Sequence, residues 1–221
     1  PEEGHRRRRL QLGGGARRGA GFAELSWRPG YHDLSDESRG FVPGSAIEVA
    51  SWRLRWDGGE KRISVRDFRA LEIVSVSPFD PWILKPSWTV GTGLDTAFEL
   101  GKEPSESLVY EGHRGTGLAV EPVEGVLAFA LVQAEGAAGA ALREGWRAGG
   151  GLRGGLAADL APSWRLIADA SLAGHPWGDA TPNHRLRVAL NWTPARDLSV
   201  RGELMIRGPH REAGLYGAIY Y

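Results

Sequence analysis

The sequence predicts an all-β fold, an antiparallel transmembrane β-barrel of about twelve strands of the outer-membrane type. Three observations predict it: apolar and polar residues alternate with a period of two, the composition is typical of strands, and the aromatic residues gather near segment ends. A period of two places apolar side chains on one face of a strand and polar side chains on the other. Barrels of this length fold as one unit, so we expect a single domain over residues 1–221.

The composition excludes several classes of protein. With 32 glycines, 9 tryptophans and one methionine, the chain is unlike a helical core. No run of about 18 apolar residues occurs, which excludes a transmembrane helix but not a barrel, whose strands leave only short alternating signals. Lys plus Arg and Asp plus Glu both number 27, so no bulk charge attracts nucleic acid. The absence of cysteine excludes disulfides and thiolate chemistry within this chain.

The first half of the chain holds six alternating segments. Asp57, Gly58 and Gly59 form a hairpin signal after the third segment. The apolar parity slips in the fourth segment, which predicts a β-bulge near Asp67 and Phe68. The apolar positions are Leu10 and Leu12; Ala23, Leu25 and Trp27; Ala50, Trp52, Leu54 and Trp56; Ile63, Val65, Leu71 and Ile73; Trp88, Val90, Leu94, Phe98 and Leu100; and Leu118 and Val120.

The second half holds six more segments, joined by tight turns such as 161–163 and 193–197. An even number of segments of roughly ten residues is what membrane-spanning hairpins require. Their apolar positions are Leu127, Phe129 and Leu131; Leu152, Leu156 and Leu160; Trp164, Leu166, Ala168, Ala170 and Leu172; Leu186, Val188, Leu190 and Trp192; Leu198, Val200, Leu204 and Ile206; and Leu215, Ile219 and Tyr221.

Alternation alone does not say which face is inside, and a soluble lipocalin-like barrel is the alternative. Two features favour a membrane barrel, with charge inside and apolar residues outside. Small residues share the charged face, as a crowded polar interior requires: Gly13, Gly91, Gly93, Gly115, Gly117, Gly149, Gly151 and Gly155. Aromatic residues lie at or near segment ends, as in interfacial girdles: Trp27, Trp52, Trp56, Trp88, Trp146, Trp164, Trp192, Tyr110 and Tyr221.

The charged face is then the lumen. Arginines and carboxylates on it would pair across the interior, which favours a plugged or narrow barrel over an open pore. The predicted lumen-facing charges are Arg53, Arg55, Asp95, Glu99, Arg153, Asp169, Arg187, Arg201 and Glu203.

The most distinctive segment of the sequence is the polar connection from Tyr31 to Gly44. Counting strands from the N-terminus places it on the periplasmic side together with both chain ends. A Ser, His and acid triad needs residues converging from different elements, whereas His32, Asp33 and Ser35 are neighbours on one connection. Asp33 and Ser35 are also turn formers, so we expect an Asx-type turn or a docking surface and no catalytic residue. The candidate residues for this docking loop are Tyr31, His32, Asp33, Leu34, Pro43 and Gly44.

Other motifs point to no metal and no cofactor. The remaining histidines lack metal-ligand spacing. The run Arg6 to Arg9 fits a membrane interface or a linker end better than a nucleic-acid patch. Gly149 to Gly155 lacks the Lys and Ser or Thr of a phosphate loop.

The run from Phe22 to Leu100 carries a specific pattern of residues. They are Arg28, Pro29, Tyr31 to Leu34, Gly40 to Gly44, Ile47, Glu48, Glu72 to Ser75 and Pro86 to Trp88. This pattern resembles the C-terminal region of Lnb-like bacterial envelope proteins, also called domain of unknown function 4105. In this chain, Glu72 departs from the family pattern, which has Asp there.

The resemblance implies an N-terminal periplasmic domain, papain-like with a Cys and His pair, that takes part in lipoprotein N-acyl transfer. Because this chain has no cysteine, we expect that domain to precede residue 1. The chain itself is then a bacterial outer-membrane barrel whose partners are outer-membrane lipid and its own periplasmic domain, and which anchors and docks that domain. Two alternatives stay open: a lipid hydrolase or acyltransferase that uses His32 or His113 with a serine, and a narrow pore.

Overall fold

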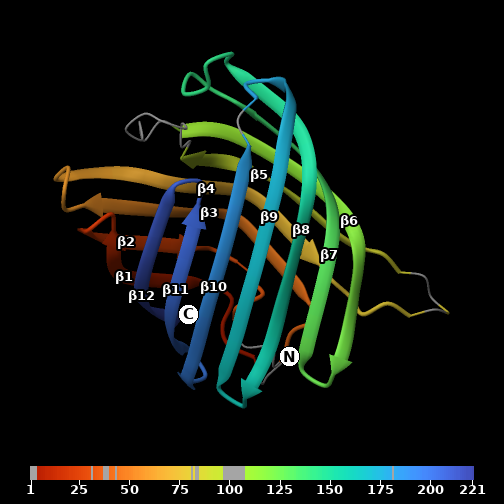
Figure 1. The fold of residues 1–221 in the computed structure, drawn as a ribbon. Coiled ribbons are helices and arrows are strands. Elements are labelled where there is room, and N and C mark those ends of the chain that lie inside the picture. The colour runs from red at the N-terminus through yellow and green to blue at the C-terminus, as the bar shows by residue number, and fades with distance from the viewer. Residues whose placement is uncertain are drawn as a thin grey trace.

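The computed structural model describes residues 4–30, 32–36, 40–42, 44–80, 82, 85–96, 108–180 and 182–221. It is a closed antiparallel barrel in which each strand pairs with its chain neighbours and β12 pairs with β1 (Figure 1). The strands are β1 (Arg9–Arg17), β2 (Ala20–Arg28), β3 (Ser45–Asp57), β4 (Arg62–Ser75), β5 (Ser87–Thr96), β6 (Leu108–Val123), β7 (Val126–Ala138), β8 (Trp146–Ala161), β9 (Trp164–Gly178), β10 (Asn183–Ala195), β11 (Leu198–Arg207) and β12 (His210–Tyr220).

The predicted fold class is confirmed, and most strands are longer than the sequence pattern indicated. β1 continues through three glycines to Arg17, and β12 begins at His210 rather than near Leu215. Polar and small residues dilute the alternation in these stretches, but pairing from Arg9 with Tyr220 to Arg17 with Glu212 closes the barrel. The last predicted residues of the fifth segment, Phe98 and Leu100, lie outside the described residues.

The predicted bulge lies in β4, beside the expected position. Against β3, Arg53 pairs with Asp67 and Leu54 with Val65, so Arg66 is the extra residue. Both Arg66 and Asp67 are therefore buried on the inner side. A bulge places two neighbours against one partner and re-aims their side chains, which explains the slip in parity.

On most strands the side chains are arranged with charge inside and apolar residues outside, as the membrane-barrel interpretation predicted. β7 differs: Leu127, Phe129 and Leu131, which the sequence assigned to the apolar outer face, are buried inside the barrel. Residues 126–132 are all apolar, so alternation does not distinguish the two faces there. Large apolar side chains remain exposed on the outer face of almost every strand, including Leu12, Val132, Leu152, Leu172 and Leu215 at 63–65%. Inner-face positions hold buried arginines and carboxylates instead. Within the described residues there is no helix with the length and hydropathy needed to cross a membrane.

Tryptophans and tyrosines form a belt near each end of the outer face. Trp27 donates a hydrogen bond to the Tyr221 hydroxyl at 2.8 Å and lies beside Trp52. Trp164 stacks on Trp192 with ring centroids 5.8 Å apart at the same end of the barrel. The belt at the other end holds the exposed Trp56, Tyr110 and Trp146. Amphipathic aromatic rings prefer the level of lipid headgroups, so the two belts mark where the bilayer ends.

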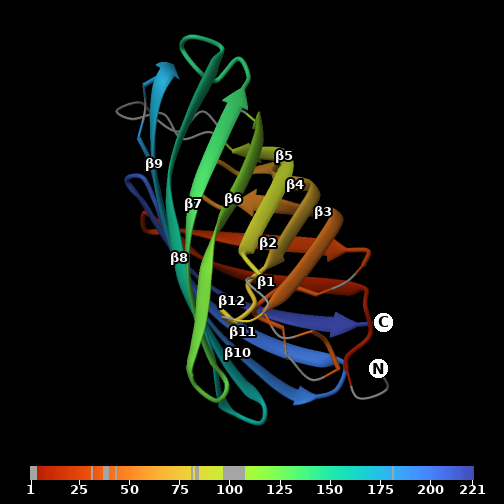
Figure 2. The same cartoon turned by 90° about the vertical axis from the view of Figure 1, so that its right-hand side faces the viewer.

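Both chain termini lie at the same mouth of the barrel (Figure 2). We call this the terminal mouth; it also carries the connection after β2 and the turns after β4, β6, β8 and β10. Main-chain hydrogen bonds join Arg8 to Tyr221 there. The connections after the odd-numbered strands lie at the opposite mouth.

Candidate functional site: a charged lumen closed at the terminal mouth

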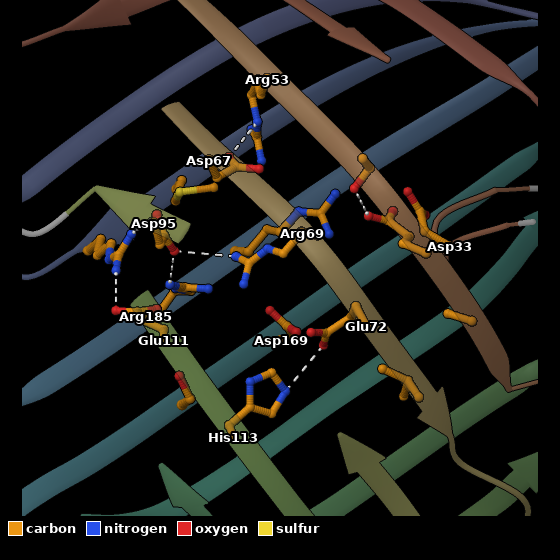
Figure 3. A pocket seen from close by; sticks show the side chains of 18 of the residues that line it. Asp33, Arg53, Asp67, Arg69, Glu72, Asp95, Glu111, His113, Asp169 and Arg185 are labelled. Atoms are coloured by element: carbon orange, nitrogen blue, oxygen red, sulfur yellow. Dashed lines mark hydrogen bonds and ion pairs between the residues drawn. The ribbon is translucent and has the colours of Figure 1, made fainter. Parts of the chain in front are cut away.

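The barrel encloses a lumen cavity of about 260 Å³ whose lining is mostly charged and polar. Residues from most of the strands and from the connection after β2 line it. Figure 3 shows side chains from β3, β4, β5, β6, β9 and β10 pointing into this space. A closed barrel with charged inner residues on facing walls concentrates ionisable groups where solvent is scarce.

Part of the polar connection after β2 folds into the terminal mouth rather than away from the barrel. Arg9 of β1 donates to Asp33 at 2.8 Å and to Asp36 at 3.1 Å. Arg28 of β2 pairs with Asp36 and lies 3.4 Å from Asp33, and Arg201 of β11 donates to Asp36 at 3.2 Å. We call these five residues the terminal clamp.

Local hydrogen bonds shape the connection into a turn. The Ser35 amide and hydroxyl both donate to the Asp33 carboxylate, and the Asp36 amide donates to the Asp33 carbonyl at 3.1 Å. This is the Asx-type turn that the sequence predicted. Because the turn holds both carboxylates on one side, a single short segment forms ion pairs with three arginines.

The charge state of the clamp follows from its neighbours. Burial alone would raise the pKa of Asp33, but Arg201, Arg9 and Arg28 together hold that pKa well below its usual range. Burial also opposes ionisation of Asp36, and Arg28, Arg9 and Arg201 outweigh it, so its pKa is lowered too. Both carboxylates are therefore charged across the ordinary acid range.

Leu34 faces the interior beyond the clamp. Its side chain packs against an apolar cluster inside the barrel, and the Arg165 side chain of β9 donates to its carbonyl oxygen at 2.7 Å. The turn thus contacts walls on both sides of the mouth. We call the cluster the apolar floor; its buried members are Ala46, Val74, Val76, Ala119, Leu127, Phe129, Leu131, Ala157 and Ile167.

Gly44 fixes the return of the connection into β3. Its φ of +69° lies in the left-handed region, and a Cβ there would overlap the Val76 carbonyl oxygen. The Val76 amide donates to the Gly44 carbonyl at 2.8 Å. Glycine is required by both conformation and space.

Four of the predicted docking residues lie in or beside this turn: His32, Asp33, Leu34 and Gly44. The side chains of Asp33 and Leu34 point into the lumen. Tyr31 and Pro43 lie outside the described residues. Arg9, Arg28, Asp36 and Arg165 were not among the predicted site residues. No pattern in the sequence shows that they meet, because they lie up to 156 positions apart in the chain.

The predicted lumen charges that the structure describes all point inward, and each forms at least one ion pair. Arg53 pairs with Asp67 at 2.9 Å, Arg187 with Glu203 at 2.9 Å and Arg153 with Asp169 at 2.9 Å. Arg55 binds Glu24 and Glu212, Arg201 belongs to the terminal clamp, and Asp95 contacts three arginines. Glu99 lies outside the described residues.

The histidines proposed for hydrolysis do not meet a complete catalytic set. The His32 Nε2 lies 3.3 Å from the Ser45 hydroxyl, but no hydrogen bond orients its Nδ1 among the described residues. His113 lies 3.3 Å from Glu72, with no serine bonded to it in the described part of the chain. A triad needs a nucleophile, a base and an orienting acid joined by successive hydrogen bonds. Neither histidine is bonded to both a serine and an acid among the described residues. Across the described ranges, no cluster of three or more His, Cys, Asp or Glu is placed to hold a metal ion.

Comparison with solved structures shows the same fold. The chain is similar to the NanC porin, with a TM-score of 0.56 and 11% identity, and to the KdgM porin, with a TM-score of 0.55 and 10% identity. Each comparison covers 96% of this chain and 99% of the porin. Together with the apolar outer face and the aromatic belts, the fold identifies an outer-membrane β-barrel.

No curated protein matches the chain. A family model, described as a domain of unknown function (DUF7840), matches residues 1–215. That match does not bear on the resemblance to Lnb-like proteins, which stays a prediction. The chain belongs to the DUF7840 family.

Proposed function

We propose that this barrel is a narrow channel for small hydrophilic solutes, held closed at its terminal mouth by the connection after β2. The observation that supports it is the cavity of about 260 Å³, lined by ionisable groups and bounded at one mouth by the terminal clamp. A barrel that serves only as an anchor needs no polar cavity. The narrow lumen also agrees with the fold shared with two porins.

The closure has the properties of a gate. It rests on a short turn held by ion pairs and by the hydrogen bond from the Arg165 side chain to the Leu34 carbonyl, with Leu34 as its apolar contact. The Ile47 amide of β3 also donates to the His32 carbonyl at 3.0 Å. Residues 33–36 lie outside the strands, so their release breaks no pairing between strands. The mouth with three two-residue turns, after β6, β8 and β10, is the periplasmic one in our proposal, because outer-membrane barrels have short periplasmic turns.

Planar-bilayer recording of the purified chain tests the channel. We expect small, infrequent unitary currents from the wild type, and frequent openings once both clamp carboxylates are replaced in Asp33→Asn, Asp36→Asn. A folded double variant that carries no current would overturn the proposal. The matched control is the variant Leu204→Val, which changes an exposed side chain on the lipid-facing side of the barrel.

A second candidate is the anchor and docking platform for a periplasmic catalytic domain. Its support is that the N-terminal segment lies against the connection after β2: the His5 ring packs 4.7 Å from Phe41 of that connection and 4.0 Å from Tyr220. A domain ahead of residue 1 would emerge beside the connection. Proteolysis of the full-length product ahead of residue 1 tests this. A released soluble fragment with N-acyltransferase activity supports the anchor, whereas a full-length product without such a domain excludes it.

A further inference from the structure

Asp95, on the inner face of β5, receives three arginines. Arg207 of β11 lies 2.7 Å from its Oδ1, while Arg185 of β10 and Arg69 of β4 lie 3.1 Å and 3.3 Å from its Oδ2. Figure 3 shows Arg69 and Arg185 converging on this carboxylate from two directions. One carboxylate neutralises one guanidinium group, so the arginines around Asp95 carry more positive charge than the Asp95 carboxylate neutralises.

The neighbouring carboxylate does not remove the excess. Glu111 of β6 is itself shared by Arg147 and Arg207, both at 3.3 Å from the same oxygen. Arg69 and Arg185 share one oxygen of Asp95, and Arg147 shares its oxygen of Glu111 with Arg207. Arg69, Arg147 and Arg185 therefore meet only two carboxylates among the described residues. We call Arg69, Arg147, Arg185, Arg207, Asp95 and Glu111 the Asp95 cluster.

The rest of the described lumen is more evenly paired. In the terminal clamp three arginines meet Asp33 and Asp36, and Glu48 lies 3.6 Å from Arg28 as a third carboxylate. Arg53, Arg153 and Arg187 each have a carboxylate of their own. The positive excess is thus local to the Asp95 cluster, and it lines the cavity.

Two of the guanidinium groups are the most accessible part of the Asp95 cluster. The side chain of Arg185 is 28% exposed and that of Arg69 is 19% exposed, against 17% for Glu111 and 5% for Asp95. A solute in the cavity therefore meets the Arg185 and Arg69 side chains, which share one oxygen of Asp95.

We propose that the Asp95 cluster binds a small oxyanion, a carboxylate or a phosphate, inside the lumen. Planar guanidinium groups bind such anions through paired charge-assisted hydrogen bonds. A cavity of about 260 Å³ lies below the range of drug-sized pockets, so the solute is small. This proposal extends the proposed channel function by naming the class of solute. Transport of the anion rests on that function, whereas binding of the anion at the site does not.

Titration calorimetry of the full chain in detergent micelles tests the site, with sodium phosphate and sodium succinate as separate probes at constant ionic strength in sodium chloride. We expect saturable binding of at least one probe. Arg185→Gln should weaken it about tenfold or more, because a hydrogen bond to a charged group is lost. Arg69→Gln is a second variant with the same expectation. In both variants Asp95 keeps two arginines, so folding is retained.

Arg187→Gln is the matched control. Arg187 lies two residues from Arg185 on the same face of β10, is 26% exposed, and has Glu203 as its own partner. We expect its effect on affinity to stay below about threefold, because no uncompensated charge is removed. Absence of saturable binding, or an equal loss in Arg187→Gln and Arg185→Gln, would overturn the site. Binding without bilayer conductance would support the site and exclude the channel.

Discussion

The Arg165 side chain on β9 donates to the carbonyl oxygen of Leu34 at 2.7 Å, joining two residues 131 positions apart in the chain. On the other side of the turn, Arg9 and Arg28 hold Asp33 and Asp36 from β1 and β2. The turn at the terminal mouth is therefore tied to two separate parts of the barrel wall. Release of either tie has measurable consequences.

Asp36→Asn should open the mouth. The Asp36 carboxylate is completely buried among Arg9, Arg28 and Arg201, and removing one partner of a buried ion pair costs about 3–5 kcal/mol. We expect the ratio of open to closed time in bilayer recordings to rise about a hundredfold or more. Asp197→Asn, at the same mouth but in an exposed pair with Arg6, should change it less than about twofold. Equal effects of the two changes would contradict the clamp.

The closed state should withstand mild acid. The folded pKa of Asp33 and that of Asp36 are both lowered, so the stabilisation they contribute is present above their ordinary pKa and is lost only as pH falls through the lowered values. Conductance should therefore be the same at about pH 7.5 and about pH 4.5.

Two histidines lie beside the clamp. Burial lowers the pKa of His32 below its ordinary value, and the His5 Nε2 lies 3.8 Å from the Asp36 carboxylate. Recording in the double variant His5→Gln, His32→Gln removes both imidazoles, and the comparison between the two pH values then reports the carboxylates alone. Opening of this double variant at about pH 4.5 would show that Asp33 and Asp36 titrate in their ordinary range.

A charge placed in the middle of the outer face should destabilise the barrel strongly. Leu152 lies mid-strand on the lipid side of β8 and is 65% exposed, whereas Leu160 lies near the end of the same strand. Leu152→Arg should lower the free energy of unfolding in lipid vesicles by about 2–4 kcal/mol, and Leu160→Arg by about 0–1 kcal/mol. Urea unfolding monitored by tryptophan fluorescence measures both. Equal and small effects would place the outer face in water.

Gly151 should not tolerate a methyl group. It lies on the inner face of β8, where a Cβ would overlap the carbonyl oxygen of Leu172 on β9. Gly151→Ala should destabilise the barrel by about 1–3 kcal/mol, since backbone has to move. Gly202→Ala is the control, because a Cβ there meets no atom within 4 Å. The same urea assay separates the two, and a neutral Gly151→Ala would contradict the close approach of β8 and β9.

The sequence by itself determined the fold class and the inner face of those strands in which charged and apolar residues alternate; it assigned Leu127, Phe129 and Leu131 of β7 to the wrong face. Alternation such as Leu186, Val188 and Leu190 against Arg185 and Arg187 needs only the geometry of a strand to assign faces, and β10 places them so. Glycines on the charged face and tryptophans at segment ends decided that the apolar face lies outside. These signals are local, and a single strand carries them.

Only the tertiary structure decided where the connection after β2 lies and which residues it contacts. Asp33 and Leu34 were expected to form part of a surface for another domain, and the structure turns both into the lumen. The partners of Asp33 and Asp36 come from β1, β2 and β11, which meet only because the barrel closes between β12 and β1. The positive excess at Asp95 arises in the same way, from strands β4, β10 and β11. Charge balance depends on distances between strands far apart in sequence, and no periodicity along one strand encodes them.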